Sequence, residues 1–218
     1  MKIEPGSLNF YRVGHSIAVW ENHSAQTERP RFNLSEKYPT LIFPKDKDGT
    51  ANGFGSAALI RNDMLYVYGC EFEIELYTSP CLLARVKIDS ILDRNQWQFF
   101  ASGKGWSANL ADATQVFEGA NMTSVFYNSY IERYIAVYSK PVSTDVMFRT
   151  SANPEGPWSA SLKLFEAEAP VGGIGWVYDA LAHPEFSQDD GRIFYVSYSR
   201  TTGPLRSEFY LVAVELEK

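Results

Sequence analysis

Three short apolar segments, each with a tyrosine just before a small residue, constrain the fold of this chain most. Each follows turn-forming residues, and the segments are residues 64–69, 134–139 and 193–199. Apolar runs of this length that follow a turn predict β-strands entered through hairpins. We therefore interpret the three segments as three copies of one hairpin.

A further apolar strand follows each copy, and an edge strand led by Trp97 or Trp158 follows the first two. The downstream strands are residues 82–88, 146–150 and 209–216. A strand, a hairpin strand and two further strands make up one blade of a β-propeller. The repeated tyrosines, Tyr68, Tyr138 and Tyr198, lie 60 to 70 residues apart, more than the roughly 40 to 50 residues of common propeller repeats.

The predicted fold is one all-β domain over residues 1–218, a β-propeller of four-stranded blades. Three full blades and a partial N-terminal unit are expected, at residues 53–102, 120–167, 176–218 and 8–44. The innermost strands should be the first of each blade, at residues 53–60, 122–128 and 178–186. Because the last blade shows no tryptophan-led outer strand, we expect a strand from residues 8–21 to complete it.

Net charge argues against two classes of partner. The chain carries a formal charge of -6 and has a pI of about 5.2, so it offers no basic surface for nucleic acid or an anionic membrane. The N-terminus has no apolar signal-peptide core, and no apolar run approaches the roughly 20 residues of a membrane span. We expect a soluble chain, cytoplasmic as given or secreted if already processed.

Cys70 and Cys81 flank a predicted hairpin and could face each other across it. Two reduced structural thiols are the favoured interpretation, and a disulfide, which would imply an oxidising compartment, is the alternative. No histidine lies near them, so we expect no zinc site. Residues 172–175 lack the lysine and helix of a phosphate loop, and no serine-elbow or zincin motif is present, so no metal or cofactor is expected.

The sequence resembles a known bacterial family in four stretches. They are residues 55–69, 83–86, 182–199 and, most specifically, 149–159 (Arg-Thr-Ser-Ala-Asn-Pro-Glu-Gly-Pro-Trp-Ser). The resemblance is to a domain-of-unknown-function family of five-bladed propellers, related to endo-D-arabinanases and the arabinanase and fructosidase superfamily. It implies a funnel whose innermost strands present carboxylates to a sugar. We expect this chain to begin after the blade that carries the base-like Asp in the related hydrolases.

Asp179 and His183 are the leading catalytic candidates. Both lie on the third innermost strand, where a period of two places them on one face with Leu181. A histidine beside a carboxylate could contact a sugar, or the two could form a buried structural pair. Glu71, which alternates with Glu73 and Glu75, is the next candidate acid, although a solvated hairpin face is the favoured interpretation of all three.

Aromatic and basic residues supply the substrate-binding candidates. Trp106 and Trp176 lie in glycine-rich loops, and Tyr178 follows Trp176 closely, so these rings could stack on a sugar. Arg85 and Arg149 occupy equivalent positions in two blades, which favours a repeated structural role over sugar contact.

Three functions remain open at this stage. The first is a glycoside-hydrolase-like propeller that acts on arabinan-type polysaccharide, or derives from enzymes that do. The others are a non-catalytic carbohydrate-binding module and a propeller fragment completed by self-association into a homo-oligomer. An enzyme requires two carboxyls within about 10 Å in one pocket, whereas Asp179 alone there would favour the binding module.

Overall fold

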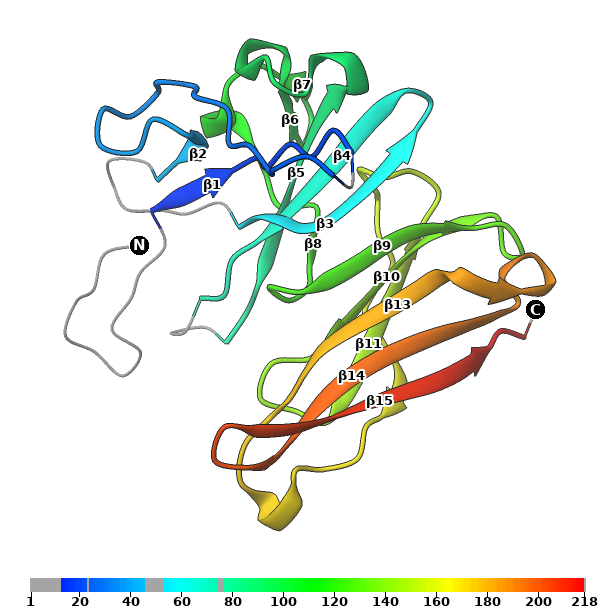
Figure 1. Cartoon of the computed structure of the whole chain (residues 1–218). Coiled ribbons are helices and arrows are strands. Elements are labelled where there is room, and N and C mark those ends of the chain that lie inside the picture. Colours follow the sequence, from blue (N-terminus) through cyan, green and yellow to red (C-terminus); the bar gives the residue numbers. More distant parts are fainter. Residues whose placement is uncertain (1–12, 23, 46–52, 74–76, 218) are drawn as a thin grey trace.

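The computed structural model describes residues 13–22, 24–45, 53–73 and 77–217. These residues form an all-β protein with short 3₁₀ turns and without an α-helix in the described ranges. No helix in those ranges is long and apolar enough to cross a membrane. The chain is organised as three antiparallel sheets plus a short N-terminal pair of strands (Figure 1).

Each sheet is built in chain order from the inside outward. The first comprises β3 (Phe54–Arg61), β4 (Met64–Cys70), β5 (Pro80–Lys87), β6 (Gln98–Ala101) and β7 (Gly105–Ser107), with β8 (Phe117–Glu118) paired to β5. The second comprises β9 (Thr123–Asn128), β10 (Arg133–Ser139), β11 (Asp145–Ser151) and β12 (Leu162–Glu166). The third comprises β13 (Val177–Gln188), β14 (Ile193–Gly203) and β15 (Arg206–Glu215).

The first strands of the three sheets lie next to one another. β3 contacts β9, and β9 contacts β13, so the sheets extend outward from a shared row of inner strands (Figure 1). This is the arrangement of propeller blades, and it confirms the predicted all-β propeller fold. Tyr68, Tyr138 and Tyr198 lie on β4, β10 and β14, the second strand of each sheet, as the hairpin interpretation requires.

Apolar side chains from facing sheets form the core. Between the first and second sheets, Tyr68 and Leu83 pack with Val125 and Ala136. The tyrosine's buried hydroxyl donates to the Pro154 carbonyl oxygen of the second sheet's outer loop at 2.6 Å. Between the second and third sheets, the completely buried side chains include Ile135, Val137, Phe194 and Val196. Each interface therefore stabilises two sheets at once.

The N-terminal strands cover the first sheet and do not complete the third. β1 (Gly14–Ser16) pairs with β2 (Leu41–Pro44), and Ile42 and Phe43 are buried against the outer side of the first sheet. The ring of Phe43 lies 4.9 Å from that of Phe54 and 5.1 Å from that of Trp97, between centroids. The expectation that residues 8–21 complete the last blade is wrong for the described residues 13–21, because β1 pairs with β2, and β2 packs on the first sheet. Residues 8–12 lie outside the described ranges.

The two cysteines form a disulfide, so the favoured interpretation of reduced thiols is wrong. Cys70 on β4 and Cys81 on β5 are directly opposed in the ladder, with Cα atoms 4.0 Å apart. Both are completely buried at the interface with the second sheet. The bond closes the base of the hairpin tip between Cys70 and Cys81, and its described residues Phe72, Tyr77 and Ser79 line a cavity.

Candidate functional site

A cavity of about 590 Å³ lies where loops of all three sheets meet. The hairpin tip after β4, the segment before β9, the turn after β10 and the start of β13 contribute to its wall. Its lining residues are Phe72, Tyr77, Ser79, Ala120, Asn121, Met122, Ser139, Lys140, Pro141, Val142, Trp176, Val177, Tyr178 and Asp179. The wall is thus mainly apolar and aromatic with a few polar groups, which is typical of small-molecule sites.

Two exposed aromatic side chains stand in this wall. Trp176 is 62% exposed and Tyr77 is 61% exposed, although large apolar side chains are normally buried. The Trp176 backbone is fixed by Thr201, whose amide donates to the Trp176 carbonyl at 3.0 Å and whose Oγ1 accepts from the Trp176 amide at 3.1 Å. Tyr77 packs edge-on against Phe72, with ring centroids 6.3 Å apart. These rings are therefore available to stack on a ligand.

Asp179 reaches the cavity through a β-bulge. The register between β13 and β14 shifts between Tyr178 and Leu181, and Asp179 has a φ of 55°. Partial burial raises the pKa of its carboxyl above the ordinary value. Among the described residues that line the cavity, Asp179 is the sole carboxylate. The adjacent Ala180 amide donates to Ser139 Oγ at 3.0 Å, which ties this strand to the second sheet.

Backbone strain collects around the cavity. Tyr77, Val142 and Asp179 have φ values of 53°, 55° and 55°, a region that is unfavourable for bulky and β-branched side chains. Such conformations cost of order 1–3 kcal/mol each and cluster at functional sites. Their concentration in one wall supports a binding role for this cavity over an accidental hollow.

Of the predicted residues, the structure brings Trp176, Tyr178 and Asp179 together in the cavity. His183 is not among the lining residues. Its Nε2 lies 2.8 Å from Ser197 Oγ and its Nδ1 lies 3.1 Å from Glu185 Oε1. The bulge at Asp179 interrupts the period of two, so the predicted shared face of Asp179 and His183 does not form.

The other candidates lie outside the cavity wall. Glu71 is half-buried and Glu73 is exposed, and Glu75 lies outside the described residues. The Arg85 guanidinium carbon lies 3.9 Å from the centroid of the Trp106 ring, so that ring already has a partner. Arg85 also donates to Gln98 Oε1 at 2.9 Å.

Arg149 is held by hydrogen bonds to backbone carbonyl oxygens. It donates to the Glu118 and Ser159 carbonyl oxygens at 3.1 and 2.8 Å. Because Glu118 precedes the second sheet, Arg149 holds the connection between the first two sheets. This placement agrees with the structural interpretation of both arginines.

Sequence reasoning missed the hairpin tip. Phe72 and Tyr77 are not among the predicted site residues, because the alternating glutamates beside them indicate a solvated face. An available signal was the pair of aromatic residues at a turn between two strands, since a turn exposes side chains that a strand would bury.

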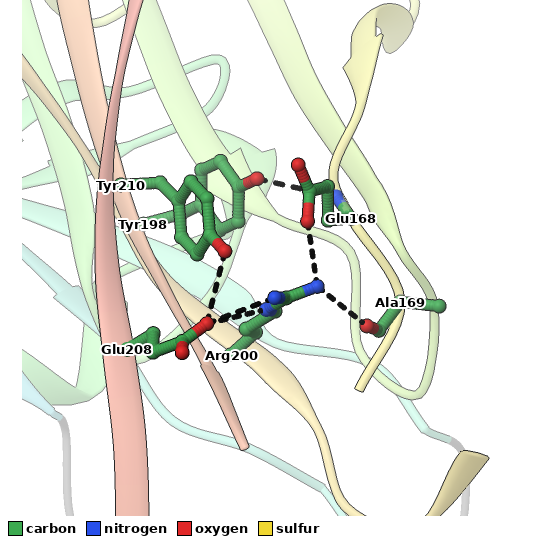
Figure 2. Close-up of polar contacts among 6 residues, drawn as sticks. All are labelled: Glu168, Ala169, Tyr198, Arg200, Glu208 and Tyr210. Atoms are coloured by element: carbon green, nitrogen blue, oxygen red, sulfur yellow. Dashed lines mark hydrogen bonds and ion pairs between the residues drawn. The ribbon is translucent and has the colours of Figure 1, made fainter. Parts of the chain in front are cut away.

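A second polar cluster surrounds Arg200 on the third sheet, and all its charges are paired (Figure 2). Arg200 binds Glu168 at 2.6 Å and Glu208 at 2.8 Å. Tyr210 donates to Glu208 at 2.9 Å, and Tyr198 Oη accepts from the Glu168 amide at 3.2 Å. These contacts attach the third sheet to the segment after β12. In the described ranges, no group of three or more His, Cys, Asp or Glu side chains is placed to hold a metal ion.

The chain is similar to one protein family and to several solved structures. The sequence profile of a domain of unknown function, DUF4185, matches residues 8–214. No curated protein matches the sequence. A crystal structure from Bacteroides ovatus, of a protein assigned only provisionally as a hydrolase, has a TM-score of 0.56 at 21% identity, with 81% of this chain and 49% of that chain covered.

Two glycoside hydrolases are more distant. A GH62 hydrolase in complex with xylotriose has a TM-score of 0.49 at 13% identity, covering 79% of this chain and 50% of that one. A GH43_1 enzyme from Xanthomonas citri has a TM-score of 0.35 at 12% identity, covering 72% and 66%. This chain spans about half the length of the first two structures. At 21% identity, the Bacteroides ovatus structure indicates a shared fold and does not indicate a shared activity.

Proposed function

We propose that this chain, which belongs to the DUF4185 family of domains of unknown function, binds carbohydrate in the cavity where its three sheets meet. The observation that carries the proposal is the convergence of exposed rings, strained backbone and one carboxylate in a space of about 590 Å³. The family was predicted to be related to endo-D-arabinanases, and that link stays a prediction.

The chemistry of the wall suits a neutral sugar. Trp176 and Tyr77 offer apolar faces to the C–H groups of a sugar ring, which gain from leaving water. Asp179 can accept hydrogen bonds from two neighbouring hydroxyls, and Asn121 can both donate and accept. The finer part of the proposal is an arabinan-type glycan, and its support is the sequence resemblance described above.

Binding is favoured over hydrolysis because the described residues of the wall contain only one carboxyl. Glycoside hydrolysis uses two carboxyls, at about 5 Å or at about 6.5–9.5 Å apart. Neither β3 nor β9 contains an Asp or Glu, and Asp179 is the single carboxylate among the described lining residues. The site can therefore hold a sugar, but its described part does not supply the acid and base pair.

Hydrolysis is the second candidate, and one observation favours it. The pKa of Asp179 is raised by burial, which is the direction of shift that a general acid requires. A partner carboxyl would then have to come from outside the described lining.

Calorimetric titration with arabino-, xylo- and galacto-oligosaccharides tests the proposal. Replacing Trp176 by Ala should weaken the best ligand about tenfold, or about 1.4 kcal/mol, because a stacking face is lost. Phe186→Ala is the matched control, since Phe186 lies on β13, the strand that directly follows Trp176, is 63% exposed and does not line the cavity. Equal affinities of the two variants, or no binding of any glycan by the parent chain, would contradict the proposal.

The same glycans distinguish the two candidate functions by product analysis. Binding without turnover is the expected result. Turnover that disappears in Asp179→Asn, with binding retained, would establish the hydrolase instead.

A further inference from the structure

The outer edge of β15 has no strand partner in the described part of the chain. β15 pairs with β14 from Ile193–Glu215 to Gly203–Arg206, and the sheet ends there. In Figure 1 this strand, in red, forms the free margin of the third sheet. The second sheet has four strands and the third has three, so one further strand could be added. Ten residues of backbone donors and acceptors lie along this edge.

Side chains on β15 alternate between a packed and a free side. Tyr210, Val212 and Val214 pack onto the core between the second and third sheets. On the other side, Phe209 is 70% exposed and Leu211 is 58% exposed. Residues 209–214 (Phe-Tyr-Leu-Val-Ala-Val) contain no charge, proline or glycine. Soluble proteins normally protect an edge strand with such residues, so this edge is suited to pairing.

We propose that two copies of this chain pair through β15, antiparallel, with Leu211 on the two-fold axis. When the axis is perpendicular to the sheet, the exposed side chains of both strands point to the same face of the joined sheet. The exposed side chains of β15 are odd-numbered, so each odd-numbered residue lies opposite an odd-numbered residue of the second copy. Centring on Leu211 places Phe209 opposite Ala213 of the second copy, twice by symmetry. A large ring then lies beside a small side chain on the free side of the joined sheet.

Neighbouring registers are less complementary. A shift of two residues in one direction places Phe209 opposite Leu211 twice by symmetry, a bulkier arrangement than the single Leu211–Leu211 pair of the proposed register. The same shift in the other direction places the ring opposite the exposed Glu215 carboxylate. In the proposed register Glu215, whose carboxylate binds Arg192 of its own chain, faces Ser207, so no like charges meet. The pairing occupies the free edge of β15 in each of the two copies. No free β15 edge is left for a third copy, so the assembly stops at a dimer.

Cysteine cross-linking of the full 218-residue chain tests the register. The chain's two cysteines are already paired, so the described residues contain no free thiol. Leu211→Cys should give a disulfide-linked dimer on mild oxidation, because directly opposed Cα atoms lie about 4.5–5.5 Å apart, within disulfide range. Ala213→Cys is the control on the same side of the same strand. Its two copies would lie about four residues, or about 13 Å, apart along the strand and should not cross-link.

Light scattering with size-exclusion chromatography tests the association itself. The parent chain should show the mass of two 24.6 kDa chains, and Leu211→Lys should show the mass of one. Leu162→Lys, at a 55% exposed position on β12, should stay dimeric, and unchanged circular dichroism would show that both variants fold. A monomeric parent, a dimer that survives Leu211→Lys, or cross-linking of Ala213→Cys in place of Leu211→Cys would each overturn the proposal. These outcomes do not depend on sugar binding.

Discussion

At the scale of single residues, two buried serines offer a sharp comparison. Ser79 lines the cavity and is 1% exposed, and its hydroxyl has no hydrogen-bond partner among the described residues. Ser56 is also buried, but its hydroxyl donates to the Gly53 carbonyl at 2.9 Å and accepts from the Cys70 amide at 3.0 Å. The first hydroxyl therefore has no partner among the described residues, whereas the second satisfies a backbone donor.

Ser79→Ala should therefore leave the free energy of unfolding unchanged or raise it, since it removes a buried hydroxyl that no described residue pairs with. Ser56→Ala should lower it by about 1–3 kcal/mol, because the Cys70 amide loses its acceptor. Urea denaturation of both variants gives the comparison. A loss for Ser79→Ala as large as that for Ser56→Ala would show that the Ser79 hydroxyl has a partner after all.

Asp179 should make stability depend on pH in an unusual direction. Burial raises the pKa of this carboxyl in the folded state, so the folded chain holds the proton more tightly than the unfolded chain. Its contribution is then fully present below the unfolded pKa and is lost as pH rises through the folded pKa. Asp179→Asn should raise the melting temperature near neutral pH and give no gain at pH 3.

Asp145→Asn is the control for this titration. Lys163 lies 3.0 Å from the Asp145 carboxylate and lowers the pKa of that carboxyl. Its contribution is present above the unfolded pKa and is lost as pH falls through the folded pKa, so this variant should lose stability near neutral pH. Melting curves from pH 3 to 8 would contradict the interpretation if the two variants moved in the same direction.

At the scale of elements, the disulfide determines the wall of the cavity. The bond joins residues 11 apart in sequence and closes the hairpin tip that carries Phe72, Tyr77 and Ser79. A closed loop of this length stabilises the folded state by about 2–3 kcal/mol through the unfolded chain. Opening it also releases the tip on which the aromatic pair depends.

Replacing Cys70 and Cys81 together by Ser should therefore lower both the free energy of unfolding and the affinity for the glycan. Reductant should have the same two effects on the parent chain and none on the double variant. Denaturation and calorimetric titration, each with and without reductant, measure this. Unchanged affinity in the double variant would show that the tip holds its shape without the bond.

The strands could be predicted from the sequence, but the orientation of their side chains could not. Turn residues and apolar runs place β4, β10 and β14 correctly, because hairpin signals are local. Yet Tyr68 of the first sheet packs onto the sheet that follows it in the chain, whereas Tyr198 of the third sheet packs onto the sheet that precedes it. A shift of one residue reverses every side chain of a strand, and nothing local in the sequence reveals that shift.

Part of the candidate site can also be predicted from the sequence, because that part depends on a local pattern. Trp176, Tyr178 and Asp179 follow a glycine-rich loop into an inner strand, and that pattern is visible in the sequence. The bulge that separates Asp179 from His183 depends on pairing with β14, and the contribution of Tyr77 depends on how a distant hairpin tip folds over. These are long-range effects that residue spacing does not contain.

At the scale of the whole molecule, the three sheets form an open row. The first sheet contacts the second and the second contacts the third, and the major contacts of the described residues include none between the first and the third. An open row behaves like a repeat array, in which each unit is stabilised only by its neighbours. The end sheets should then open independently of each other, and the second sheet should open last.

Hydrogen exchange of two core variants tests this order. Phe99 is buried among the aromatic rings of the first sheet, and Phe194 is buried between the second and third sheets. Either change to Ala should cost about 3–5 kcal/mol. Phe99→Ala should speed exchange of β4 and β5 amides and leave β14 amides unchanged, because no shared interface transmits the loss. Phe194→Ala should speed exchange of β14 amides and leave β4 and β5 amides unchanged. In the parent chain, the amides of β10 should exchange most slowly. Equal acceleration in both end sheets by either variant would mean that the row unfolds as one unit.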